Sequence, residues 1–159
     1  MDPFKLSERL MSMDDDAWTR HANPMSVYSR FSCLPLLVLA IWSRVWLGLW
    51  CLLPIALAVV WTWLNPRLFD PPESLDSWAS RGVLGERRFL ERATRPIPEP
   101  HQRMAHRLTA LSGIGMLMLV YGLIALDLRA TLSGLLLAIL AKLWFVDRMV
   151  WLEQEMREW

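Results

Sequence analysis

The sequence contains three histidines, and each lies beside an apolar stretch rather than inside one. His21 precedes the first apolar stretch, and His101 and His106 flank the start of a later one. If the two stretches begin side by side, these imidazoles and the nearby carboxylate of Glu86 become candidate metal ligands. Imidazole and carboxylate groups together suit zinc, iron or copper.

The spacing of these residues gives the metal hypothesis little support. His101 and His106 are five residues apart, which does not place them on one helical face, and no His-x-x-x-His or Glu-x-x-His pair occurs. Histidine is polar, so a position outside apolar stretches is expected without any metal. We therefore expect interfacial histidines that do not form a complete ligand set. The sequence identifies no catalytic residue and no cofactor.

Two long apolar blocks require a membrane to solvate them. They run over residues 31–64 and 108–152, and a transmembrane helix needs roughly 20 apolar residues. One helix over residues 24–64 would be about 60 Å long, twice the thickness of the hydrocarbon core, so each block is expected to fold back as a hairpin. The predicted turns are Ser43-Arg44 and Asp127–Arg129.

These patterns predict an all-α polytopic membrane protein with two transmembrane hairpins, or four spans. Asn23-Pro24 is expected to start the first span, Pro35 to kink it, and Asn65-Pro66 to stop the second. A central helix is expected to break at Gly82 or Gly85. The predicted segments are an interfacial N-terminal part with a short helix (1–23), the first hairpin (24–65), a cytoplasmic linker with short helices (66–104), and the second hairpin, whose last helix continues beyond the bilayer (105–159).

Positive charge orients the hairpins. Of the 17 lysines and arginines, only Arg44 and Arg129 lie at the two short turns, so the positive-inside rule places both termini and the linker in the cytoplasm. Tryptophans are expected to anchor both interfaces, because the indole N–H favours water and the ring favours hydrocarbon. The expected outer anchors are Trp42, Trp46 and Trp50, and the inner ones are Trp61, Trp63, Trp144 and Trp151.

Small residues predict where helices approach each other closely. In lipid, close contact between backbones holds helices together, and small residues permit it. The candidates lie in the third and fourth spans, and we expect them to form the seam between these spans or a contact with another subunit. They are Gly113, Gly115, Gly122, Gly134 and Ala138.

Four short strings carry a resemblance that covers most of the chain. They are His-Ala-Asn-Pro at 21–24, Asp-Ser-Trp-Ala-Ser-Arg at 76–81, Leu-Gly-Glu-Arg at 84–87 and Asp-Arg-Met-Val-Trp at 147–151. On these strings the chain resembles a family of small prokaryotic four-span membrane proteins of unknown function. The resemblance implies the inner, or plasma, membrane as location, and it implies no activity.

Three functional hypotheses follow. The first is a non-catalytic subunit or scaffold of a larger inner-membrane complex, whose partners are the lipid bilayer and other membrane subunits or further copies of the chain. The alternatives are a metal-dependent membrane enzyme with its histidine site at the cytoplasmic interface, and a small oligomeric transporter. A net charge of +1 suggests no nucleic-acid partner. Reaction, substrate, partner identity and oligomeric state are not determined by the sequence.

Overall fold

The computed structural model describes residues 15–157, and all regular structure within them is helical, which confirms the predicted all-α class for this part of the chain. The short interfacial helix predicted near the N-terminus falls largely on residues 1–14, outside the described residues. In chain order the elements are α2 (Asp15–His21), α3 (Pro24–Arg30), α4 (Cys33–Trp42), α5 (Arg44–Leu47), η1 (Gly48–Cys51), α6 (Leu52–Leu68), α7 (Trp78–Leu90), η2 (Glu91–Ala93), α8 (Glu99–Ala125) and α9 (Leu128–Arg157).

Helices α4 and α6 form the first helical pair, and α3, which leads into it, begins at the predicted residue. Asn23 is the N-cap of α3, its side chain accepts a hydrogen bond from the Met25 N–H at 2.9 Å, and Pro24 occupies the first helical position. The predicted kink is a complete break between α3 and α4 at residues 31–32. Pro35 has no N–H for the carbonyl of Phe31, so the break lies one turn before the proline.

Two details of this pair differ from the prediction. The reversal is longer than Ser43-Arg44, because α5 and η1 both lie between α4 and α6, and Gly48 takes a positive φ of 54° that favours glycine. Helix α6 does not stop at Asn65-Pro66 but continues to Leu68. Asn65 is buried and bonded to α3, which holds this turn of α6 in place despite the proline.

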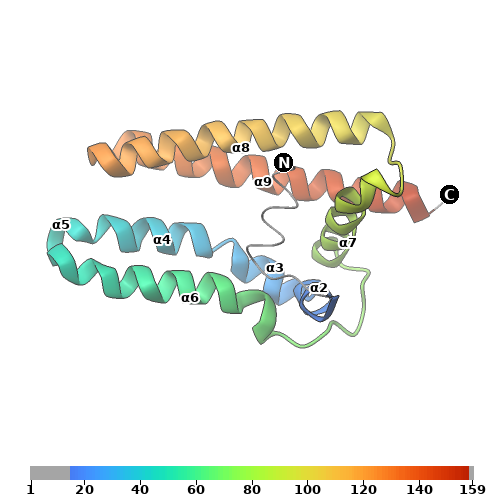
Figure 1. Ribbon diagram of the computed structural model, residues 1–159, viewed down its shortest axis with the longest axis horizontal. Helices are drawn as coiled ribbons and strands as arrows, with labels where there is room; N and C mark the ends of the chain where they lie inside the picture. The colour runs from blue at the N-terminus through green and yellow to red at the C-terminus, as the bar shows by residue number, and fades with distance from the viewer. Residues whose placement is uncertain (1–14, 158–159) are drawn as a thin grey trace.

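The second helical pair, α8 and α9, forms a close antiparallel contact over most of its length (Figure 1). Leu126 closes α8 in the left-handed conformation, and the Asp127 side chain caps α9 by accepting from the N–H groups of Arg129 and Ala130. Helix α9 then runs without interruption to Arg157, as predicted.

Glycines set the distance between α8 and α9. A Cβ added at Gly115 would lie 2.6 Å from the Ala138 nitrogen, and one at Gly122 or Gly134 would overlap the backbone of the facing helix. Gly113 is outside this seam, because a Cβ there would meet nothing within 4 Å. Because Gly113 lies two residues before Gly115, the two positions are about 200° apart around the helix axis.

Helix α7 crosses α9, and its two glycines are contact points rather than breaks. A Cβ at Gly82 would lie 2.6 Å from Val146 Cγ1, and one at Gly85 would overlap the carbonyl of Met149. The predicted interruption at Gly82 or Gly85 is therefore wrong: α7 is continuous from Trp78 to Leu90. The tertiary contact with α9 stabilises these helical glycines against their low intrinsic propensity.

Figure 1 shows how the parts are arranged. The α4–α6 pair and the α8–α9 pair lie roughly parallel, with both reversals at one end and α2, α3, α7 and the end of α9 at the other. We call this second end the base. At the reversals, the Arg44 guanidinium donates to the carbonyls of Leu123 and Ile124, and α4 packs its Val38 against Leu119.

The outer surfaces of both pairs are apolar. Leu49, Trp46 and Leu117 expose 85%, 74% and 73% of their surface, far more than a water-soluble helix normally leaves open at so many large apolar positions. Within residues 15–157, two stretches are long and apolar enough to cross a membrane, Pro24–Leu68 and Glu99–Ala125. The first of these is folded back on itself, since it contains α4 and the antiparallel α6.

Candidate functional site: a buried polar cluster at the base

A chain of hydrogen bonds joins three helices inside the base. His21 at the end of α2 lies 3.1 Å from the Ser26 hydroxyl of α3. Ser26 reaches the Asn65 amide oxygen at 3.5 Å, and the Asn65 Nδ2 donates to Ser29 Oγ at 2.7 Å. Ser29 in turn donates to the Met25 carbonyl at 2.6 Å. His21, Ser26 and Asn65 are buried, so each needs these partners in place of water.

Arg30 lies against the His21 ring. Its Nη1 is 3.1 Å from His21 Nε2 and 3.5 Å from Nδ1, and a guanidinium can only donate. The pKa of His21 is lowered from 6.5 to about 3, chiefly by burial and then by the positive charge of Arg30. The imidazole is neutral at physiological pH.

An ion pair from the second half of the chain lies beside this cluster. Lys142 of α9 donates to Glu86 of α7 at 2.9 Å, and both side chains are within electrostatic reach of His21. Burial acts to raise the pKa of Glu86, but the charge and hydrogen bond of Lys142, followed by His21 and Arg30, hold it below its usual value. Glu86 is thus ionised, and its charge links α7 and α9 to the α2–α3 region.

The surroundings of His21 do not suit nucleophilic catalysis by Ser26. An activated serine donates to an imidazole whose other nitrogen is held by a carboxylate. Here the group beside the second ring nitrogen is the Arg30 guanidinium, which is positively charged and cannot accept the ring proton. The cluster instead satisfies buried polar groups and orients Arg30.

The other two candidate histidines have partners elsewhere. His101 Nε2 lies 2.7 Å from a carboxylate oxygen of Glu155, and His106 Nδ1 lies 2.7 Å from the Gln102 carbonyl of its own helix. Within residues 15–157, no group of three or more histidine, cysteine or carboxylate side chains is arranged to hold a metal ion.

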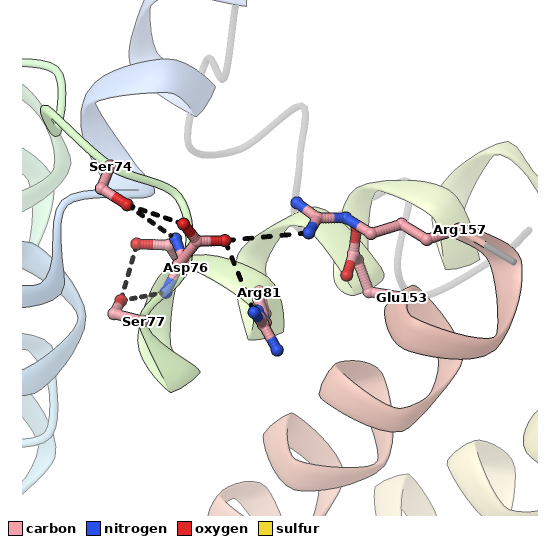
Figure 2. Close-up of polar contacts among 7 residues, drawn as sticks. Ser74, Asp76, Ser77, Arg81, Glu153 and Arg157 are labelled. Carbon is pink, nitrogen blue, oxygen red and sulfur yellow. Dashed lines mark hydrogen bonds and ion pairs between the residues drawn. The ribbon is translucent and has the colours of Figure 1, made fainter.

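A second polar cluster fastens the end of α9 to the segment before α7 (Figure 2). Asp76 lies 3.4 Å from Arg81 and 3.8 Å from Arg157, and Arg157 donates to Glu153 at 2.8 Å. Glu153 is buried in this cluster, with 1% of its side chain exposed, and Arg88 of α7 lies 3.7 Å from it.

The predicted tryptophan anchors lie at the two ends of the helical pairs. Those near the reversals include Trp46 and Trp50, which expose 74% and 79% of their surface. At the base, Trp63 exposes 48% and stacks under the Arg67 guanidinium at 4.2 Å. Trp61 donates to Ser32, and Trp42 packs against the Val38–Leu119 contact. These two side chains therefore also contribute to packing inside the protein. Trp144 and Trp151 expose 51% and 56%.

Sequence reasoning missed Ser26, Asn65 and Arg30 as members of the buried cluster. Asn65 was expected only as part of a helix stop. The available signal was weak: an Asn and an Arg within otherwise apolar stretches, each needing a buried partner.

Fold and site together define an all-α protein in which two apolar helical pairs are joined by a polar, largely buried base. A family model described as "Family of unknown function (DUF6653)" matches residues 6–158, and the chain belongs to that family. This confirms the resemblance in its coarser form, a family of unknown function. No curated protein and no solved structure matches the chain.

Proposed function

We propose that the chain is a four-span membrane protein of the prokaryotic inner membrane, with both termini and the base in the cytoplasm. The exposed apolar surface of both helical pairs carries this proposal, since burial in lipid removes its cost in water. The shared end of the two reversals and the scarcity of lysine and arginine there support the same orientation.

Within the membrane the chain acts as a non-catalytic subunit or scaffold of a larger complex. Helix α6 supports this role, because its substantial helix contacts are with α2, α3, α4 and η1 and not with α8 or α9. Leu53, Leu57 and Val60 on α6 expose half or more of their surface. The polar side chains of the base bond to one another, as in a structural core.

Topology is tested with single cysteines in a variant that lacks Cys33 and Cys51. Val45→Cys and Leu128→Cys place an exposed thiol at each reversal, and Leu75→Cys places one at the base. In intact cells, an impermeant thiol reagent is expected to label positions 45 and 128 and to label position 75 only after lysis. Labelling at 75 in intact cells refutes the orientation.

The subunit role is tested by comparing particle size in mild detergent. The chain solubilised from its native membrane is expected to migrate well above the same chain purified alone. A photo-crosslinking residue at Leu57 is expected to give one adduct of fixed mass. The matched control is Leu117 on α8, which is at least as exposed as Leu57. Identical migration of the two samples, with no discrete adduct at either position, refutes the subunit role.

A further inference from the structure

Arg30 has more hydrogen-bonding capacity than its surroundings use. A guanidinium carries five N–H donors and always keeps its charge. Within the described chain, its hydrogen bonds go to His21 alone, through Nη1 at 3.1 Å to Nε2 and 3.5 Å to Nδ1. A neutral imidazole accepts a hydrogen bond but supplies no counter-charge.

The nearest carboxylate does not neutralise Arg30 by itself. Glu86 lies within electrostatic reach of Arg30 but forms its close ion pair with Lys142, at 2.9 Å. Two cations, Arg30 and Lys142, thus share one carboxylate, while His21 is neutral. The cluster of these four side chains carries an excess of one positive charge. A buried or half-buried cation without a full counter-charge favours an anion from outside the chain.

The position of Arg30 indicates which anion fits. It ends α3, about two turns after the Asn23 cap, at the base end of the first helical pair. If the base faces the cytoplasm as proposed above, this is the depth at which phospholipid phosphates lie. The planar guanidinium fork matches the geometry of two phosphate oxygens.

We propose that Arg30, oriented by His21 and assisted by the Lys142–Glu86 pair, binds one phosphate group at the base between the two helical pairs. The inference rests on the proposed membrane topology. The Arg30–His21–Ser26–Asn65 hydrogen bonds hold the guanidinium ready for its ligand, so little ordering cost remains to be met on binding. The phosphate belongs either to an anionic lipid headgroup or to a small soluble phosphate ester.

The test uses the full-length chain purified in a neutral detergent and titrated with phosphatidylglycerol, with phosphatidylcholine, and with glycerol 3-phosphate, followed by native mass spectrometry. One saturable phosphatidylglycerol is expected, bound about tenfold more tightly than phosphatidylcholine. Saturable glycerol 3-phosphate binding, without preference for the anionic lipid, supports the site and assigns it to a soluble ligand. No saturable binding of either anionic probe overturns the proposal.

Variants locate the site. Arg30→Gln is expected to lose the tenfold preference, and Arg30→Lys to retain part of it, because lysine keeps the charge without the fork. Arg20→Gln is the matched control, since Arg20 is a nearby arginine already paired with Asp16 at 2.9 Å. Equal binding by Arg30→Gln and wild type overturns the proposal, as does a loss of the preference in Arg20→Gln as large as that in Arg30→Gln.

Binding in detergent is independent of orientation and of complex membership. Failure of the thiol-labelling experiment would therefore refute the proposed topology while leaving a measured phosphate site in place. If Arg30→Gln does not fold, the wild-type comparison between anionic and zwitterionic lipid still decides the proposal.

Discussion

Gly115→Ala tests whether backbone contact holds α8 against α9. The added Cβ would lie 2.6 Å from the Ala138 nitrogen, 3.0 Å from the Ala138 Cα and 3.0 Å from the Gly134 oxygen. Carbon contacts are favourable at about 3.5–4.0 Å, so the two helices must separate by roughly 0.5–1 Å near this point. All three neighbouring atoms are backbone atoms, and none can move aside by a change of rotamer.

The expected cost follows from two opposing terms. Overpacking of this kind costs about 1–3 kcal/mol. Replacing a helical glycine by alanine contributes about 0.5–1 kcal/mol in the other direction. Gly113→Ala has the second term without the first, because its Cβ would meet nothing within 4 Å. We therefore expect Gly113→Ala to be neutral or stabilising, and Gly115→Ala to be less stable than Gly113→Ala by about 1–3 kcal/mol.

The assay is reversible unfolding of the purified chain in mixed micelles, followed by tryptophan fluorescence as the fraction of denaturing detergent rises. Both variants remain in the same helix, so effects of insertion and of helix propensity cancel in their difference. The reasoning fails if Gly115→Ala is as stable as Gly113→Ala. In that case α8 and α9 are not held at the separation that the glycines define.

Three further perturbations test the base by the same measurement. Gly85→Ala is expected to be less stable than wild type by about 2 kcal/mol or more, because the new Cβ overlaps the Met149 carbonyl and α7 must move off α9. For His21, whose pKa is 6.5 in the unfolded chain and about 3 in the folded one, the unfolded state alone binds the proton between these values. Stability is therefore expected to fall by about 1.4 kcal/mol per pH unit as pH drops below 6.5 toward 3, and His21→Asn removes this part of the pH dependence. Glu153→Gln is expected to cost about 2 kcal/mol, because it leaves two arginines without their buried carboxylate.

The histidine and glutamate substitutions each have a matched control. His106 is exposed, so His106→Asn is expected to keep the acid response that His21→Asn loses. Glu155 is also exposed, and Glu155→Gln is expected to cost much less than Glu153→Gln. A Gly85→Ala variant as stable as wild type, or the same acid response in wild type and His21→Asn, contradicts the described packing of the base.

Capping residues and apolar lengths were enough to predict where the first helical pair starts and that each pair folds back on itself. Asn23-Pro24 specified the start of α3 because a capping side chain followed by a fixed φ favours helix at one residue. Apolar length predicted the reversal of each pair, since one helix over the first block would have been twice the bilayer thickness. The errors occur where tertiary contact overrides local preference. Gly82 and Gly85 suggest a break in isolation, but α9 packs against them and α7 stays helical.

The polar cluster was harder to predict because its members come from separate parts of the sequence. Asn65 and Ser29 are 36 residues apart, and Glu86 and Lys142 are 56 apart. No spacing rule connects them, since each pair meets only after the helical pairs have formed. What the sequence does contain is the need for partners: an arginine and an asparagine in apolar surroundings must each find a polar group. Ser26 bonds to Asn65, and His21 accepts from one nitrogen of Arg30. The remaining N–H donors of Arg30 make this cluster, rather than a metal centre built from the three histidines, the candidate ligand site.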